Sequence, residues 1–556
     1  MSSSTPTATN QPTLEIESLA QRSLVDLLLD EQGQFSAVEQ FSATHENVAG
    51  APSQAKYYEA LMPVSQPAPG QQYAFEVDLD TCSGCKSCVV ACHTLNGLDE
   101  DEAWRSVGAL VDTRDALPAV QHVTTACHHC LDPGCLNGCP VKAYDKDPVT
   151  GIVKHLDDQC IGCKYCMLMC PYEVPRYNKR LGIVRKCDMC RQRLDSSEAP
   201  ACVQSCPNAA IAIRIVDVDS KQADQRLVAE APLSTITQPT TIYKTQSESR
   251  KSGLSAQNQP ILHAQESHWP LAVMLCLTQA SVGVLFWMVI APIAFATTID
   301  SRIGLLVASA LAFAGLNVAP LHLGQPLRAW RVFLGLKTSW LSREAVLFGV
   351  YGGILFTTTL IALMETVAPG FSAVMPSWAE AAGVLAGLVS GCAAVFTSGM
   401  IYVVTRRVPW RPSRTMPRFY FTAATAGVAA CAAVVSFSGS GQLVIAIALG
   451  LQLAKVGYDW WIMFAGTRPG EHLHDQRSRR IVTEKLHRLR NLRLASAVVA
   501  ACSLGLAVVG GNFLSASAPV VLAATVVALV AVLAGEICER LLYFASVSFD
   551  SMPGAL

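Results

Sequence analysis

The chain has 556 residues and a formal net charge of −1; 51% of its residues are hydrophobic and only 15% are charged. A charge so close to zero excludes the strongly basic chain typical of nucleic-acid-binding proteins, and we expect no nucleic-acid partner. The averages hide two unlike parts, because residues up to about 267 are polar and hold sixteen of the 21 cysteines, whereas the rest of the chain is strongly apolar.

Residues 1–70 are expected to form an N-terminal extension, and its first twelve residues, rich in Ser, Thr and Pro, are predicted to be disordered. No arginine pair followed by an apolar run occurs there, so neither a Sec nor a Tat signal is visible. Residues 13–40 have leucines at helical spacing. We favour a helix packed on its own domain over one that docks to a partner subunit.

Residues 71–216 contain four runs of four cysteines each. Three of the runs are followed by proline, and the first is followed by His93 instead. The first and third have the unbroken spacing C-x2-C-x2-C-x3-C, the second is C-x2-C-x4-C-x3-C, and the fourth has eleven residues between its second and third cysteines. The runs are Cys82, Cys85, Cys88 and Cys92; Cys127, Cys130, Cys135 and Cys139; Cys160, Cys163, Cys166 and Cys170; and Cys187, Cys190, Cys202 and Cys206.

This spacing is typical of bacterial-type ferredoxins, in which three cysteines wrap one cubane and the fourth ligates a neighbouring cluster. Disulfides would need an oxidising compartment, and structural zinc usually takes two C-x2-C pairs set well apart. We therefore favour iron–sulfur clusters over both alternatives.

Strands are expected at 74–78, 151–154 and 209–216, next to cysteine runs, and this repetition predicts a tandem ferredoxin-like α+β domain. If each unit is pseudo-symmetric, the second run pairs with the third, and the first pairs with the fourth. The last cysteine of each run then completes the set of its partner run. The expected sets are Cys82, Cys85, Cys88 with Cys206; Cys127, Cys130, Cys135 with Cys170; Cys160, Cys163, Cys166 with Cys139; and Cys187, Cys190, Cys202 with Cys92.

The segment CIGCKYCMLMCPYEVPRYN at 160–178, within this four-by-four layout, resembles the electron-transfer subunit of the dimethyl sulfoxide reductase family. The resemblance implies four clusters that form a wire out of a molybdopterin-containing catalytic subunit. In nitrate-reductase relatives a Trp replaces one cysteine of the third run and gives a three-iron cluster. Here Cys160, Cys163 and Cys166 are all present, which implies four [4Fe–4S] clusters.

Residues 217–267 are rich in Ser, Thr, Gln and Lys and predict a flexible linker. Residues 268–546 are expected to form an all-α eight-helix transmembrane bundle, and 547–556 a C-terminal tail. Each apolar run is long enough to cross a hydrocarbon core of roughly 30 Å. The eight runs are 269–294, 302–322, 343–366, 379–404, 417–438, 442–464, 491–511 and 518–541.

The loops between these runs alternate in charge. Loops 323–342, 405–416 and 465–490 are basic, whereas 367–378 and 512–517 have no Lys or Arg. The positive-inside rule places the basic loops in the cytoplasm. We therefore expect a multi-pass protein of the cytoplasmic membrane, with the cluster domain and both termini on the cytoplasmic side.

Residues 321–344, LHLGQPLRAWRVFLGLKTSWLSRE, resemble the anchor subunit of dimethyl sulfoxide reductase, an eight-helix quinol-oxidising module, and GEICERLLYFAS at 535–546 fits the same family. The resemblance implicates His322 and Glu344 in binding menaquinol. His accepts a proton near neutral pH and could bind a quinone carbonyl, and Glu344 would pass the proton onward. The purely structural alternatives are that His322 donates a hydrogen bond to a loop carbonyl, and that Glu344 interacts favourably with the helix dipole in a first turn capped by Ser342.

Other polar residues of the apolar half are weaker candidates. Arg328 and Arg331 are either topology signals or docking contacts. Lys455 and Asp459, four residues apart, are interpreted as a structural ion pair. Glu536, Glu539 and Arg540 remain candidates, and the five scattered cysteines are expected to be packing residues. Those cysteines are Cys276, Cys392, Cys431, Cys502 and Cys538.

The sequence thus predicts a fused electron-transfer and anchor subunit. It would oxidise menaquinol or ubiquinol from the quinone pool and pass electrons to a molybdopterin partner that holds the terminal substrate site. Three alternatives remain open: reverse flow from a partner such as formate dehydrogenase, an electron conduit without a molybdenum partner, and a zinc-rich membrane scaffold.

Overall fold

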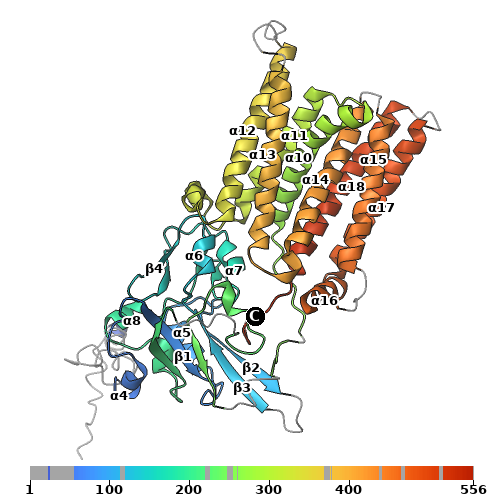
Figure 1. Cartoon of the computed structure of the whole chain (residues 1–556). Helices are drawn as coiled ribbons and strands as arrows, with labels where there is room; N and C mark the ends of the chain where they lie inside the picture. Colours follow the sequence, from blue (N-terminus) through green and yellow to red (C-terminus); the bar gives the residue numbers. More distant parts are fainter. Residues whose placement is uncertain are drawn as a thin grey trace, which may run out of the picture.

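A computed structural model of the chain describes residues 55–112, 119–219, 226–246, 254–259, 261–367, 378–437, 441–464, 470–512 and 517–554, together with 23–25 and 376. The disorder predicted for 1–12 lies outside these residues, as does nearly all of the helix predicted for 13–40. The described chain forms two parts, a mixed domain of short strands and helices and a bundle of long helices that stands on it (Figure 1).

The mixed domain is built from four small sheets. The strand predictions hold with small shifts in their bounds: β1 covers all of 74–78 and β8 most of 209–216, whereas β5 covers only the second half of 151–154. One sheet has the order β8-β1-β9 and a second the order β10-β2-β3, while β4-β5 and β6-β7 are two-stranded. The strands are β1 Gln71–Asp78, β2 Ser106–Asp112, β3 Ala119–Thr125, β4 Tyr144–Lys146, β5 Val153–His155, β6 Arg176–Asn178, β7 Ile183–Arg185, β8 Ile211–Asp217, β9 Ile242–Lys244 and β10 Ser255–Ala256.

Of the short helices of the mixed domain, α5 to α9 follow or interrupt the cysteine runs. Their first residues come directly after a cluster-loop turn, and Lys86, Lys164 and Cys190 adopt the left-handed conformation just before three of them. The helices are α4 Ala55–Tyr58, η1 Glu59–Leu61, α5 Ser87–Leu95, α6 Gly134–Gly138, α7 Tyr165–Met169, α8 Arg191–Asp195, α9 Ala201–Gln204 and η2 Ser234–Ile236. Strand, cysteine loop and helix therefore repeat as expected for a tandem ferredoxin-like domain.

The prediction of a flexible linker at 217–267 is wrong for its described parts. β9 pairs in parallel with β1, and β10 pairs with β2, so both complete sheets of the mixed domain. Val228, Ala231 and Leu254 are buried in the same core as Val77 and Leu110. The polar composition misled the prediction because threonines here point inward, with Thr237, Thr240 and Thr241 all buried.

The apolar half forms eight helices long and apolar enough to cross a membrane. The helices are α10 Trp269–Phe295, α11 Ser301–Val318 with η4 Ala319–His322, α12 Trp340–Val367, α13 Ala379–Val403, α14 Pro412–Phe437, α15 Gln442–Asp459 with the π-turn η8 Trp460–Phe464, α17 His487–Asn512 and α18 Ala518–Ala545. Between them lie η5 Pro326–Gly335, η7 Val408–Trp410, α16 Leu473–Arg480 and η9 Ile481–Lys485. Three helices begin earlier than predicted, because their first turns carry charged residues that hydropathy excludes.

Close helix crossing depends on glycine in the middle of the bundle. A Cβ placed on Gly283 of α10 would lie 1.9 Å from the carbonyl oxygen of Ala423 on α14, and one on Gly427 would meet the backbone of Gly283. Small residues at such crossings let helix backbones approach, which is a main source of packing between helices in lipid.

The C-terminal tail returns to the mixed domain. Met552 is fully buried in a core that includes Val77, Leu110 and Val123. A Cβ on Gly108 of β2 would lie 2.1 Å from the backbone of Pro553, so the tail crosses this strand in direct contact. The two parts of the molecule are thus held together at both ends of the bundle sequence.

Candidate electron-transfer and quinol site

Two cavities in the mixed domain are each lined by four cysteines from two different runs. One is lined by Cys127, Cys130, Cys135 and Cys170, the last of which follows α7 of the third run. The other is lined by Cys82, Cys85, Cys88 and Cys206. The structure therefore brings together the residues of two of the four expected sets. We call the pairing nested, because the second and third runs pair inside the pair formed by the first and fourth.

The other two sets also gather. The pKa of Cys166 is raised well above the ordinary value, first by burial and then by the neighbouring thiols of Cys163, Cys160 and Cys139. These four pack in one core.

In the last set, the side-chain amide of Asn96 lies between the sulfurs of two cysteines from different runs. Nδ2 of Asn96 lies 3.7 Å from Sγ of Cys92 and 3.8 Å from Sγ of Cys190. Burial raises the pKa of Cys92 to about 12, and the thiol of Cys202 contributes. Cys187 is in turn within electrostatic range of Cys92 and Cys190.

The surroundings of these sulfurs fit an anionic iron–sulfur cluster. Backbone N–H groups point at several of them: that of Ala143 lies 3.2 Å from Sγ of Cys139, and that of Ala210 lies 3.3 Å from Sγ of Cys206. Nζ of the buried Lys186 lies 3.5 Å from Sγ of Cys127. Hydrogen bonds and cations of this kind stabilise thiolates and bridging sulfide and help set cluster potential. Within the described residues, no group of three or more His, Cys, Asp or Glu side chains is arranged to hold a single metal ion.

The third cysteine run is the part of the mixed domain that meets the membrane helices. Arg328 of η5 donates to the carbonyls of Asp157 and Cys160 at 3.0 and 3.2 Å, and Arg331 donates to that of Asp158 at 2.7 Å. These arginines were predicted to be either topology signals or docking contacts, and the structure shows that they make docking contacts.

The backbones also touch here. The N–H of Gln325 donates to the carbonyl of Ile161 at 3.0 Å. A Cβ on Gly324 would lie 1.9 Å from the carbonyl oxygen of Gly182, and one on Gly162 would lie 2.9 Å from Cα of Gly324. Glycine at these positions lets the loop after η4 lie directly on the cluster loop.

Helix α7 completes this junction. The hydroxyl of Tyr165 donates to the carbonyl of Ile401 at 3.3 Å, and Tyr165 and Cys163 both pack against the core of the helical bundle. Leu323 packs on the core that holds Cys139, Cys160 and Cys166. The set completed by Cys139 is therefore the one that lies against the membrane half.

Glu344 and His322 lie at this junction but have different partners. Glu344 is buried in α12, and its Oε1 accepts a hydrogen bond from Ser398 of α13. The N-cap reading of Ser342 is wrong, since α12 begins at Trp340 and the Ser342 hydroxyl donates to the carbonyl of Pro140 at 3.4 Å. Nδ1 of His322 is in contact with the carbonyl oxygen of Ala319, as the loop-carbonyl reading expected.

A cavity of about 100 Å³ lies between α7, the segment before α10 and the bundle. Its polar lining includes Lys164, Glu266 and His268, and its apolar wall includes Tyr402 and Trp410. Burial lowers the pKa of His268, while the nearby Glu266 opposes this shift.

Neither His322 nor Glu344 lines this cavity, but each is close enough to residues of its lining to influence them electrostatically. His322 lies within electrostatic range of His268 and Lys164, and Glu344 lies within range of Tyr402. Sequence reasoning missed His268, although a histidine directly before an apolar run was a visible signal.

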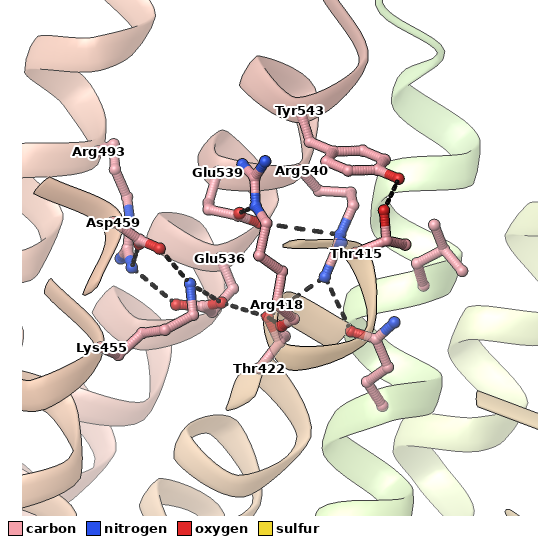
Figure 2. A network of polar contacts seen from close by, with 12 residues as sticks. Thr415, Arg418, Thr422, Lys455, Asp459, Arg493, Glu536, Glu539, Arg540 and Tyr543 are labelled. Carbon is pink, nitrogen blue, oxygen red and sulfur yellow. Dashed lines mark hydrogen bonds and ion pairs between the residues drawn. The ribbon is translucent and has the colours of Figure 1, made fainter. Parts of the chain in front are cut away.

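A buried ion network occupies the bundle near α14, α15, α17 and α18 (Figure 2). The Lys455–Asp459 pair is confirmed at 2.7 Å, but both residues have further partners. Arg493 lies 2.7 Å from Asp459 and 2.8 Å from Glu536, and Arg418 lies 2.6 Å from Glu539. Sequence reasoning missed Arg418 and Arg493, because the acidic partners of each come from other helices.

The scattered cysteines divide into two kinds. Cys276, Cys431 and Cys538 are buried, as expected of packing residues, and Cys392 is half-buried. Cys502 is exposed on the outside of α17, so the packing prediction is wrong for this residue.

Comparisons with known proteins divide the chain as the structure does. Residues 119–215 match the family model of a 4Fe-4S dicluster domain, and residues 262–545 match that of the DMSO reductase anchor subunit (DmsC). The chain is similar to the B subunit of the anaerobic dimethyl sulfoxide reductase of Haemophilus influenzae, with 33% identity over 33% of this chain and 94% of that protein. It has 34% identity to the B subunit of the same enzyme from Escherichia coli (strain K12), over 33% of this chain and 93% of that protein.

A third relative is the iron-sulfur subunit of the nitrate-inducible formate dehydrogenase of Escherichia coli (strain K12), 35% identical over 27% of this chain and 57% of that protein. The anchor match covers more than half of the chain and contains all eight long apolar helices. The chain therefore belongs to the dimethyl sulfoxide reductase anchor family, with an iron–sulfur electron-transfer domain similar to the B subunit of that enzyme fused in front of its multi-pass membrane anchor.

Proposed function

We propose that this chain oxidises quinol at the junction of its two halves and passes the electrons through four [4Fe–4S] clusters to a molybdopterin-containing catalytic subunit. The observation that carries the proposal is the packing of the third cysteine run against the membrane bundle, beside a cavity with polar and aromatic walls. An electron donor bound there is next to the cysteine set completed by Cys139, so its electrons need not cross the bilayer.

The proposed ligands are the four nested sets. Cys139, Cys160, Cys163 and Cys166 would hold the cluster next to the membrane. Four sulfurs placed around a cavity, each set taken from two runs, favour cubanes over the single ions of a zinc scaffold. The remaining sets are Cys127, Cys130, Cys135 with Cys170; Cys187, Cys190, Cys202 with Cys92; and Cys82, Cys85, Cys88 with Cys206.

The proposed quinol site is the cavity at the junction. A quinol loses two electrons and two protons, so its hydroxyls need acceptors within reach. His268 lines the cavity, and His322 and Glu344 are within electrostatic reach of residues of its lining. We assign the first proton acceptance to the two histidines. Glu344 would accept a proton from them through the polar side chains of this region.

The direction and the partner are proposals drawn from the relatives. Two relatives are B subunits of anaerobic dimethyl sulfoxide reductases, and the anchor match is to the same enzyme. These favour quinol oxidation and a reductive partner. The iron–sulfur subunit of formate dehydrogenase is similar over the cluster domain alone, so reverse flow has less support.

The proposed orientation places the cluster domain in the cytoplasm. The basic loops that carry Arg328, Arg411 and Arg477 all lie at the end of the bundle that meets the cluster domain, and positive loops face the cytoplasm. Reporter fusions at Arg411 and Gln476 should read as cytoplasmic, and those at Gly370 and Ser515 as periplasmic. An exported reporter at residue 1 would contradict this orientation.

The test of the quinol site is His322→Ala and Glu344→Gln in the full chain. His322→Ala should slow the reduction of the clusters by a soluble naphthoquinol by about a hundred-fold or more, which is the usual contribution of one positioned base. Glu344→Gln keeps size and hydrogen bonding, and we expect a smaller loss that depends on pH. The iron content should stay unchanged in both, since no cysteine is altered.

The matched control is His263→Ala. His263 is exposed on the segment that leads to His268 and does not line the junction cavity. It should leave the rate unchanged. Normal reduction of the clusters by quinol in His322→Ala would overturn the site assignment.

A further inference from the structure

Two cations of the mixed domain are buried without an acidic partner. Arg105, directly before β2, is 3% exposed, and Lys186, directly after β7, is 2% exposed. Among the described residues neither forms an ion pair with Asp or Glu, and the groups that act on their charges are cysteines. By contrast, Arg418 and Arg493 of the bundle network are paired with carboxylates (Figure 2). Because a buried charge without a counter-charge is very costly, Arg105 and Lys186 need another negative partner.

The cysteine sets would supply this partner when they hold clusters. A cubane with four thiolate ligands is an anion, and its charge becomes more negative by one when it takes up an electron. Three of the four sets lie around the two cations. We call them the inner set, Cys127, Cys130, Cys135 and Cys170; the middle set, Cys187, Cys190, Cys202 and Cys92; and the outer set, Cys82, Cys85, Cys88 and Cys206.

Lys186 lies between the inner and middle sets. Its Nζ is 3.5 Å from Sγ of Cys127, and Lys186 lines the cavity that the inner set surrounds. The same Nζ donates to the carbonyl oxygen of Cys187, the first member of the middle set, at 2.8 Å. A further hydrogen bond goes to the carbonyl of Val153. An ammonium group has three N–H donors, so these three contacts fix it between the two sets.

Arg105 lies between the middle and outer sets. Its Nη1 donates to the hydroxyl of Thr124 at 3.1 Å, and that hydroxyl is 3.5 Å from Sγ of Cys88 in the outer set. Toward the middle set, Arg105 acts on Cys202. Burial raises the pKa of this thiol to about 11, and the Arg105 guanidinium opposes the rise.

One nitrogen of the guanidinium is left for a further acceptor. Nη2 of Arg105 is buried and has no hydrogen-bond partner within the described residues. The guanidinium carbon lies 4.8 Å from the ring centroid of Phe75, which packs in one core with Cys88, Cys187 and Cys202. The open N–H group is therefore buried among cysteines of two sets, where sulfur is the acceptor that the site offers.

We propose that Lys186 and Arg105 are shared counter-ions of successive clusters, each of which raises the reduction potential of the two clusters beside it. The proposal rests on the [4Fe–4S] clusters of the proposed function. Reduction adds one electron to a cluster and neither forms nor breaks a bond. A fixed cation in a low-dielectric interior favours the more negative, reduced form by Coulomb attraction. The middle set meets both cations, so the potential of its cluster is raised twice.

Sharing has a consequence for electron transfer along the chain of clusters. A cation that belongs to one cluster would hold an electron there and oppose its transfer to the next. A cation between two clusters stabilises the electron on either side of it, so that this stabilisation changes little when the electron moves. Lys186 would serve the step between the inner and middle sets, and Arg105 the step between the middle and outer sets.

The test is a redox titration of the purified full chain with dithionite and chemical mediators, followed by EPR. Arg105→Gln and Lys186→Gln remove the charge but keep a polar side chain. Each should lower two of the four midpoint potentials and leave the other two in place. At a fixed solution potential we expect the ratio of reduced to oxidised cluster to fall by about ten-fold or more, where ten-fold corresponds to about 59 mV for one electron.

The double variant gives a sharper result. Arg105→Gln combined with Lys186→Gln should lower three potentials, and one of the three should fall about twice as far as the others, because the middle set loses both cations. A double variant in which four potentials fall, or in which no potential falls further than in the single variants, would contradict the shared positions of the two cations.

Lys146→Gln is the matched control, because Lys146 is a cation that meets a single set. Its Nζ donates to the carbonyls of Cys130 and Leu131, both at 3.1 Å, and both carbonyls belong to the loop of the inner set. Lys146→Gln should therefore lower one potential only. A fall of two potentials in this variant would show that the effect of a cation spreads beyond its contacts, and the sharing would be overturned.

Variants that keep the charge separate electrostatics from packing. Arg105→Lys and Lys186→Arg should restore the potentials toward wild type and keep about sixteen iron per chain. If a Gln variant loses iron, the proposal stands only where the charge-keeping variant of the same residue retains it. Loss of iron in both variants would mean that the side chain acts through its shape, and would overturn the proposal for that residue.

The outcomes also separate this proposal from the proposed function. A Gln variant that keeps its iron and titrates like wild type, or shifts a single potential, overturns the sharing and leaves the clusters in place. A wild-type chain without cubanes overturns both proposals. Clusters that dithionite titrates as expected but quinol does not reduce overturn the quinol site alone, since no quinol is used in this titration.

Discussion

Because Gly324 has no side chain, the two halves of the molecule can approach each other closely at this residue. The backbone of Gly324 lies against Gly182, and a Cβ there would come within 2.5 Å of both the carbonyl carbon and oxygen of that residue. Both partners are backbone atoms in short turns, so neither can turn aside as a side chain would. The contact between the membrane anchor and the cluster loop therefore depends on glycine.

Gly324→Ala should loosen this junction by about 1–3 kcal/mol, the usual cost of overpacking a tight site. Hydrogen exchange should become faster in residues 157–163 and 323–331, which make the contact. Gly353→Ala on α12 is the control, because a Cβ there meets nothing within 4 Å. Equal exchange rates in Gly324→Ala and wild type would show that the junction tolerates the methyl group.

Asp550 links three parts of the molecule at a single carboxylate. One oxygen lies 2.9 Å from His474 of α16, and the other lies 2.7 Å from Arg226 of the mixed domain. Burial works to raise the pKa of Asp550, but hydrogen bonds from His474 and Arg226 outweigh it and hold that pKa below its ordinary value.

This shift gives a pH dependence with a definite sign. A depressed folded-state pKa stabilises the tail above the unfolded value of about 3.9 and loses that contribution as the pH falls through the lower folded value. Exchange protection factors of residues 547–554 should therefore be constant from neutral pH to about 4 and fall below it. Asp550→Asn should lower them at neutral pH and abolish the fall; an unchanged acid response in that variant would exclude Asp550 as its cause.

At the residue scale, the cysteine ligand sets could be predicted from the sequence, whereas most partners of the buried charged residues could not. Ligand spacing is local, so the runs and their nested pairing follow from sequence, and the structure gathers the expected sets. Arg418 and Arg493 were missed because their partners lie on other helices. Ser342 was misread as a cap because the apolar run was taken to begin at residue 343, whereas α12 begins at Trp340.

At the scale of elements, η5 has two unlike faces. Arg328 and Arg331 bind carbonyls of the cluster loop, whereas Leu327, Trp330 and Phe333 are exposed in the isolated chain. The helix lies between the end of η4 and the start of α12, at the surface where the bundle meets the cluster domain. Exposed Trp and Phe at that level are typical of segments that lie in the lipid headgroup region.

We therefore expect η5 to rest in the membrane interface. Brominated lipids should quench the fluorescence of Trp330, which is 67% exposed, so Trp330→Phe should remove a large quenchable component. Trp410→Phe is the control, because Trp410 is 2% exposed and donates to the carbonyl of Tyr543. Equal quenching in wild type and Trp330→Phe would place η5 outside the lipid.

The eight membrane helices were predictable because hydropathy over about 20 residues is a strong signal. The segment 226–246 was not, because a short strand that adds to an existing sheet is held by its neighbours and needs no apolar pattern of its own. β9, with three residues, is fixed by pairing with β1. The segment is indeed polar in composition, but the flexible structure inferred from that composition was wrong.

At the scale of the whole molecule, fusion holds a soluble electron-transfer domain on its membrane anchor. Contacts at η5, α7 and the C-terminal tail join the halves, and the cysteine set completed by Cys139 lies at this junction. With the proposed quinol cavity on the side of the cluster domain, turnover would move neither electrons nor protons across the bilayer. We therefore expect electroneutral turnover.

The most direct measurement is anaerobic reduction of the purified chain in proteoliposomes by a soluble naphthoquinol, with the clusters followed by EPR and the external pH recorded. The chain should carry about sixteen iron and sixteen sulfide, as four cubanes require. Quinol should reduce the clusters without acidifying the side away from the cluster domain. Clusters that dithionite reduces but quinol does not would contradict the central claim that this chain takes its electrons from quinol.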